Sequence, residues 1–115
     1  INLSASDAYV NIAGGIKMNE PAIDLAIALA VVSSHKDLVI DDGMVVFGEV
    51  GLSGEVRAVS MAEQRTLEAK KLGFTSVMLP RVCMKSVEEI KGIRLIPVDN
   101  ILEAIQQIRS NRSAV

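Results

Sequence analysis

The chain has 115 residues and a formal net charge of −2, and half of its residues are hydrophobic. This balance excludes an intrinsically disordered chain, and no apolar run reaches the roughly 18 residues that a membrane-spanning helix needs. With no Trp, one Tyr and two Phe, the core has to be aliphatic. The one Cys excludes an internal disulfide and fits a reducing compartment. The length favours one domain over residues 1–115.

Charge is unevenly distributed along the chain. Residues 1–56 carry two bases against eight acids, a balance of −6, whereas residues 57–94 carry eight bases against four acids, a balance of +4. A basic segment of this kind can face nucleic acid or help subunits find each other, and it can also be ordinary solvated charge.

The first elements in chain order are a strand and an apolar helix. Residues 8–13 favour a strand that ends at Gly14-Gly15. A helix-start signal with Pro21 in the first turn follows, and residues 21–34 are apolar almost all round, which predicts a centrally buried helix. Its only charge, Asp24, lies near the N-terminus, where the helix dipole favours an anion.

The middle of the chain predicts a hairpin followed by a helix. Residues 44–50 form a nearly continuous apolar run that is typical of a buried strand. The turn-like residues 51–54 lead into a second strand over residues 55–59. Residues 61–72 have helical character and end at Gly73, which is a good helix terminator.

The last third of the chain predicts short alternating elements. Strands are expected over residues 76–79 and 93–96, with one helical turn over residues 87–90 between them. A final helix over residues 100–109 is expected to be capped by Asp99 or Asn100. This mixture of strands and helices predicts an α+β fold with α/β-type layers.

Several kinds of site are excluded by residue type and spacing. The single His35 and Cys83 provide no metal-ligand cluster, and Cys83 is expected to be a small core residue. The glycines at 14–15 and 48–54 do not have the spacing of a phosphate-binding loop. No aromatic platform is available for stacking bases, so any DNA contact has to be made electrostatically to phosphates.

Three blocks resemble the proteolytic domain of the Lon protease family: residues 19–24, 48–56 and 60–73. The resemblance implies a Lon-like fold, which is similar to domain 2 of ribosomal protein S5. In Lon, the position of Ala22 holds the nucleophilic serine and the position of Glu63 holds the catalytic lysine. Alanine has no nucleophilic atom, and a carboxylate cannot replace the amine that activates a hydroxyl. The resemblance therefore implies no catalytic residues in this chain.

An alternative register would leave room for a peptidase. Ser53 or Ser60 is then the candidate nucleophile, although Arg65 stays charged in proteins and is no base. The alternative to an inactive domain is accordingly an active serine–lysine peptidase of the Lon family.

The amino-acid sequence of these blocks resembles the sequences of the RadA/Sms family of DNA repair proteins. The similar segments are residues 8–17, 24–26, 46–57, 63–65, 68–69 and 73–74. The resemblance implies a cytoplasmic parent protein with a zinc finger and a RecA-like ATPase, which forms hexameric rings and promotes branch migration in recombinational repair. ATP, Mg and Zn are expected in that parent and no cofactor in this chain. The missing initiator Met agrees with a fragment of a longer protein.

The resemblance makes the chain a scaffold for ring assembly and DNA binding. Its partners are then single-stranded or branched DNA, a RecA-type recombinase pathway and further copies of itself, with no membrane. The candidate phosphate contacts are Arg57, Arg65, Lys70 and Lys71. A regulatory or substrate-binding domain without DNA contact is the remaining alternative.

Overall fold

A computed structural model describes residues 21–36 and 39–113, so the strand expected over residues 8–13 lies outside the described residues. The helices are η1 (Pro21–Ile23), α2 (Asp24–Lys36), α3 (Ala62–Lys71), η2 (Arg81–Cys83), α4 (Met84–Val87) and α5 (Ile101–Ser113). The strands are β1 (Met44–Val46), β2 (Glu49–Val50), β3 (Val56–Arg57), β4 (Ser76–Pro80) and β5 (Arg94–Val98). The expected mixture of helix and strand is confirmed.

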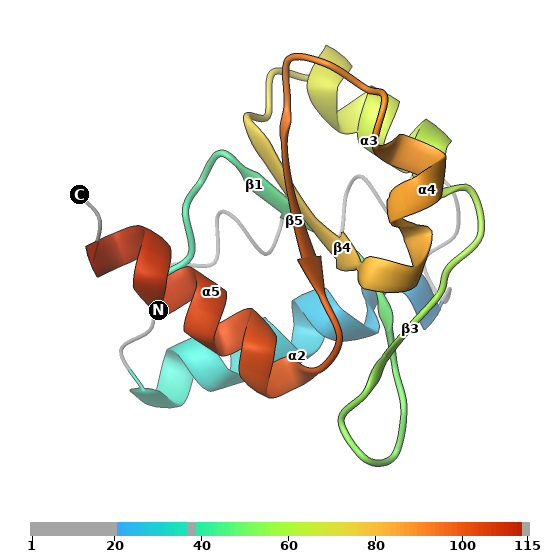
Figure 1. The fold of residues 1–115 in the computed structure, drawn as a ribbon. Helices are drawn as coiled ribbons and strands as arrows, with labels where there is room; N and C mark the ends of the chain where they lie inside the picture. Colours follow the sequence, from blue (N-terminus) through green and yellow to red (C-terminus); the bar gives the residue numbers. More distant parts are fainter. Residues whose placement is uncertain (1–20, 37–38, 114–115) are drawn as a thin grey trace.

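The main sheet is parallel. Its strands lie in the order β1-β4-β5, and Met44, Ser76 and Arg94 are in register at its amino end. Strands β2 and β3 form a separate antiparallel hairpin. The hairpin projects from the body of the molecule (Figure 1) and is tied to the carboxyl end of the sheet by a bridge between Glu55 and Asn100. The β2–β3 hairpin therefore lies at the carboxyl end of the parallel sheet, away from Met44, Ser76 and Arg94 at its amino end.

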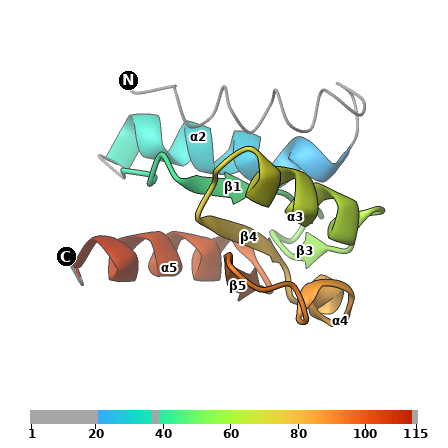
Figure 2. The same ribbon diagram turned by 90° about the horizontal axis from the view of Figure 1, so that it is seen from above.

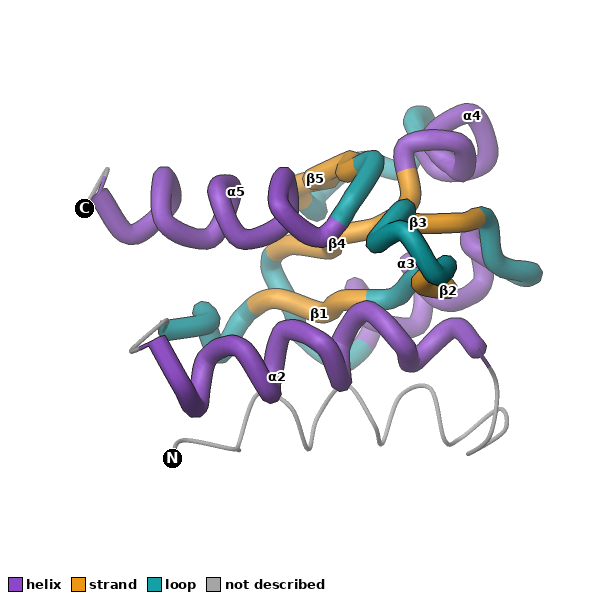
Figure 3. Tube along the Cα trace, turned by 90° about the horizontal axis from the view of Figure 1, so that it is seen from below, coloured by secondary structure: helices purple, strands orange, loops and turns teal. Residues whose placement is uncertain are grey.

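Helices cover both sides of the sheet. Helices α3 and α4 pack against each other on one side, and α2 and α5 pack against each other on the other (Figures 1 and 2). The tube view in Figure 3 looks at the molecule from the side that carries α2 and α5. The buried core between these layers is mainly Leu, Ile, Val, Ala and Met, as the composition predicts, with Phe47 as its only buried aromatic among the described residues.

The expected strand over residues 44–50 is split in two at Phe47 and Gly48. Helices η1 and α2 cause the break, because the Leu25 amide donates to the Gly48 carbonyl at 3.0 Å and the Gly48 amide donates to the Ala22 carbonyl at 2.7 Å. A Cβ at Gly48 would lie 2.9 Å from Cγ1 of Val56. A glycine is therefore needed where the start of the helix, β1 and the hairpin meet.

The prediction that helix α2 is buried on every side is wrong. Leu25 and Leu29, one turn apart, are fully buried, whereas Ile27 and Val31 are 47% and 53% exposed. One stripe of the helix packs on the core and the opposite stripe keeps its apolar side chains at the surface. Asp24 in the first turn accepts a hydrogen bond from the Val50 amide at 3.3 Å, which links the helix to β2.

The C-terminal elements agree with the sequence except at their boundaries. The helical turn expected over residues 87–90 begins earlier, at Met84. Asn100 is the cap of α5, because its Oδ1 accepts from the Glu103 amide at 2.8 Å. Glu103 in turn accepts from the Asp99 amide at 2.6 Å, so that both residues at the helix start are satisfied.

Candidate functional site

The two positions aligned with the Lon dyad lie in different surroundings. Ala22 is in η1 and only 3% exposed, and its carbonyl is held by the Gly48 amide. Glu63 is exposed in the first turn of α3 and lines a groove whose lining does not include Ala22. No nucleophile or amine therefore stands at either aligned position, and the two positions do not share this groove.

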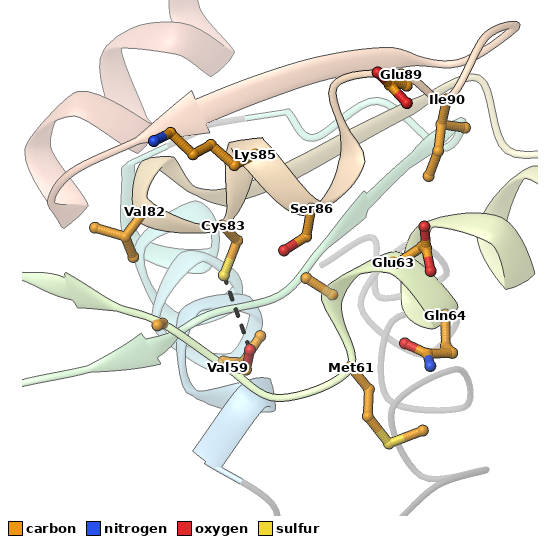
Figure 4. Close-up of a pocket in the computed structure, with 12 residues that line it drawn as sticks. Val59, Met61, Glu63, Gln64, Val82, Cys83, Lys85, Ser86, Glu89 and Ile90 are labelled. Atoms are coloured by element: carbon orange, nitrogen blue, oxygen red, sulfur yellow. Dashed lines mark hydrogen bonds between the residues drawn. The ribbon is translucent and has the colours of Figure 1, made fainter.

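The groove lies between the start of α3 and the segment that contains α4. It has a volume of about 650 Å³ and is lined by Ala58, Val59, Met61, Ala62, Glu63, Gln64, Val82, Cys83, Lys85, Ser86, Glu89 and Ile90. Figure 4 shows Ser86 between Cys83 and Glu63 with its hydroxyl on the Cys83 side, whereas the Lys85 ammonium points away from Ser86. Neighbours on one helical turn diverge in this way, so Lys85 is not placed to activate Ser86.

The floor of the groove is built from backbone and a thiol. The Cys83 side chain is buried, as expected for a core residue, and its Sγ lies 3.8 Å from the Val59 carbonyl (Figure 4). Met61 precedes α3 with φ of 61°, a left-handed conformation that is uncommon for a non-glycine residue. Helix α3 begins directly after this strained residue, beside the groove. The Met61 side chain does not cap the helix with a hydrogen bond.

Arg65 is buried, although the sequence placed it among the phosphate contacts. Its side chain is 1% exposed, and its Nε donates to the Ser60 carbonyl at 2.9 Å. It lies on the inner face of α3 together with Ala62 and Ala69, which have the spacing of one helical stripe. This side chain is out of reach of a phosphate, so Arg65 is a structural residue that fixes the turn before α3.

Arg57 is exposed but already engaged by a carboxylate. Its Nη2 and Nε lie 2.8 Å and 3.1 Å from Oε2 of Glu55. Oε1 of the same carboxylate accepts from the Ser53 amide at 3.0 Å. The ion pair is part of the β2–β3 hairpin at the carboxyl end of the sheet, where it helps to hold the turn.

Lys70 and Lys71 lie at the other end of the sheet. They are exposed in the last turn of α3, which runs back from the groove toward the amino ends of the parallel strands. The four candidate phosphate contacts are therefore divided between the hairpin, the interior and the C-terminal end of α3. Sequence spacing alone did not reveal this division.

The pKa of the Glu55 carboxyl is lowered from its ordinary value, because the carboxylate accepts a hydrogen bond from its own backbone amide and then hydrogen bonds from Arg57. A depressed carboxyl pKa stabilises the fold above the unfolded pKa, and the effect is lost as pH falls through the folded pKa. NMR titration of the Glu55 side chain should place the midpoint below 4.5. Arg57→Gln should raise this midpoint without restoring the ordinary value of a glutamate, since the backbone hydrogen bond remains. An unchanged midpoint would contradict the contact between Arg57 and Glu55.

Metal and membrane features are absent from the described part of the chain. No three His, Cys, Asp or Glu side chains gather there in a way that could hold a metal ion. None of its helices has both the length and the apolar character to cross a bilayer.

The sequence of this chain was compared with protein-family models and with known proteins. Residues 1–82 match the family model described as subunit ChlI of Mg-chelatase. The chain is 50% identical over 101 residues to the DNA repair protein RadA of Aquifex aeolicus, a match that covers 87% of this chain and 22% of the relative. It is 46% identical to those of Synechocystis sp. and Bacillus subtilis, which covers 91% and 90% of this chain and 20% and 23% of the relatives. The chain spans about a quarter or less of these relatives.

Proposed function

Because the chain belongs to the RadA family of DNA repair proteins and to the domain family described as subunit ChlI of Mg-chelatase, we propose that it is a proteolytically inactive scaffold domain. The domain has the Lon-like fold related to domain 2 of ribosomal protein S5 and occupies residues 1–115 as one unit. It supports ring assembly and DNA binding by a longer parent protein.

The observation that carries the inactive assignment is the chemistry at Ala22 and Glu63. A serine–lysine peptidase needs a hydroxyl nucleophile and a nearby amine that can lose its proton. Ala22 has no hydroxyl that could act as the nucleophile, and Glu63 has a carboxylate in place of the lysine amine. The one Ser–Lys neighbourhood in the groove, Ser86 and Lys85, has diverging side chains (Figure 4). The arrangement favours a scaffold over an active peptidase.

The parent protein is proposed to be an ATP-dependent DNA translocase. In the proposal it is cytoplasmic and hexameric, uses ATP and Mg, carries Zn in a separate finger, and promotes branch migration on single-stranded or branched DNA. Support comes from the naming of the relatives as DNA repair proteins. In the proposal the exposed Lys70 and Lys71 supply phosphate contacts, and the buried Arg65 is not one of them.

A peptidase assay on the full-length parent tests the inactive assignment. Casein and fluorogenic peptides are incubated with the protein, with and without ATP, beside an active Lon protease as the positive control. The expected result is no cleavage above the buffer blank. ATP-dependent cleavage would overturn the assignment and support the active Lon-family alternative. Its loss in Ser53→Ala, Ser60→Ala or Ser86→Ala would identify the nucleophile.

A further inference from the structure

We propose that Lys70, Lys71 and Lys91 form one phosphate-binding surface, here called the amino-end lysine cluster, which takes the sugar-phosphate backbone of DNA. The proposal rests on the DNA-binding function proposed above and assigns that function to one end of the molecule. It adds Lys91, which the sequence did not single out, and leaves out Arg57 and Arg65.

The cluster is brought together by the packing of α3 on the turn before β5. A Cβ added to Gly92 would lie 3.1 Å from Cε and 3.3 Å from Nζ of Lys70. The Lys70 ammonium therefore lies directly against the residue that follows Lys91. Gly92 has φ of 83° and no side chain, so the turn can pass under the lysine. Residues 21 positions apart in the sequence thus share one surface.

The surrounding backbone holds this end of the molecule in place. The chain leaves α3 with the Phe74 amide donating to the Ala69 carbonyl at 3.0 Å. The Thr75 amide donates to the Gly43 carbonyl at 2.8 Å, and the Arg94 amide donates to the Thr75 carbonyl at 2.9 Å. These bonds connect the end of α3 to the starts of β4 and β5. A positively charged surface on such a support needs little reorganisation to bind an anion.

The three lysines differ from Arg57 and Arg81, whose charges are neutralised by carboxylates. Arg57 is paired with Glu55, and Arg81 is paired with Asp99 and Glu103 at 3.1 Å and 2.8 Å. Within the ranges that the structure describes, no ion pair involves Lys70, Lys71 or Lys91. Their ammonium groups are exposed to solvent and therefore available to displace counterions from phosphates.

Nearby acids set the limits of the cluster. Glu68 lies one turn before Lys71 on α3, and Asp41 lies near the start of β1, where its Oδ1 accepts from the Gly43 amide. The exposed Glu88 and Glu89 stand three and two residues before Lys91, so they limit the cluster on the α4 side. The α3 dipole favours Lys70 and Lys71 in the last turn. It does not account for Lys91, which lies in the turn between α4 and β5.

Fluorescence anisotropy of the full-length protein with labelled single-stranded DNA tests the cluster. The variant Lys70→Gln/Lys91→Gln is compared with Lys85→Gln/Arg109→Gln, which removes the same charge from exposed residues of α4 and α5. With a slope of roughly −0.7 per phosphate contact, the first variant should bind about 25-fold more weakly at about 0.1 M salt and flatten the log–log slope by about 1.4. Adding Lys71→Gln should cost about another fivefold.

The controls separate this proposal from the proposed function. The matched variant should keep the wild-type slope, and both variants should keep the wild-type melting temperature, since the substituted side chains are exposed. Wild-type protein that binds no DNA would overturn the DNA-binding function itself. Binding that persists at full strength in Lys70→Gln/Lys71→Gln/Lys91→Gln, or that falls equally in the matched variant, would overturn the lysine cluster and leave DNA binding standing.

Discussion

Leu25→Ala is expected to destabilise the domain by about 2–5 kcal/mol, the usual range for truncating a fully buried leucine. Leu25 is completely buried at the start of α2 and packs where the helix meets Gly48 and the hairpin. Its neighbours are anchored by hydrogen bonds between Leu25, Gly48 and Ala22, so they cannot move freely to fill the cavity. Urea unfolding followed by circular dichroism measures the loss.

Ile27→Ala is the matched control on the same helix. Ile27 is 47% exposed, and both substitutions leave alanine, so they remove a large aliphatic side chain from similar backbone positions. The control should cost under about 1 kcal/mol, because less apolar surface returns to water. If the two variants lose equal stability, the inner and outer stripes of α2 have been assigned incorrectly.

Gly48→Ala is expected to destabilise the domain by about 1–3 kcal/mol through overpacking. The new Cβ would lie 2.9 Å from Cγ1 of Val56 and 3.3 Å from Cδ2 of Leu25. Both neighbours are buried, and the Gly48 backbone is held through its amide and its carbonyl by η1 and α2. The methyl group can therefore be accommodated only if the hairpin shifts away from the helix. Thermal unfolding and urea midpoints measure the effect.

A double-mutant cycle identifies the cause of this loss. Val56→Ala removes the closer of the two contacts, so Gly48→Ala should cost less in the Val56→Ala background than in the wild type. Ser53→Ala in the exposed hairpin turn is a control for general changes in this segment. Strictly additive losses would show that Gly48 is needed for its backbone conformation and not for the space beside Val56.

Most helices and strands in the described residues could be predicted from the sequence. The helix over residues 61–72, the strands near 76–79 and 93–96 and the cap at Asn100 all depend on local patterns of apolar residues and turn formers. Strand 44–50 was predicted as one piece because its residues are apolar throughout. Its interruption at Gly48 depends on hydrogen bonds from α2, which is distant in sequence.

The candidate phosphate contacts were harder to predict, because charge alone does not reveal burial. Arg65 shares the spacing of Ala62 and Ala69, which placed it on the inner face of α3, but its residue type indicated the surface. Lys91 stands in an unremarkable turn, and only the contact between Lys70 and Gly92 connects it to α3. The carboxylate partner of Arg57 is two residues away and was identifiable from the hairpin pattern.

The sequence by itself determined the aliphatic core, the α+β class and the absence of a serine and a lysine at positions 22 and 63. These properties depend on residue type and on periodicities that span a few residues. Only the tertiary structure decided that Arg65 is buried, that Arg57 and Lys70 lie at opposite ends of the sheet, and that Lys70 lies against Gly92, the residue after Lys91. Each of these depends on how distant segments pack, since the direction of α3 along the parallel sheet determines which charges meet.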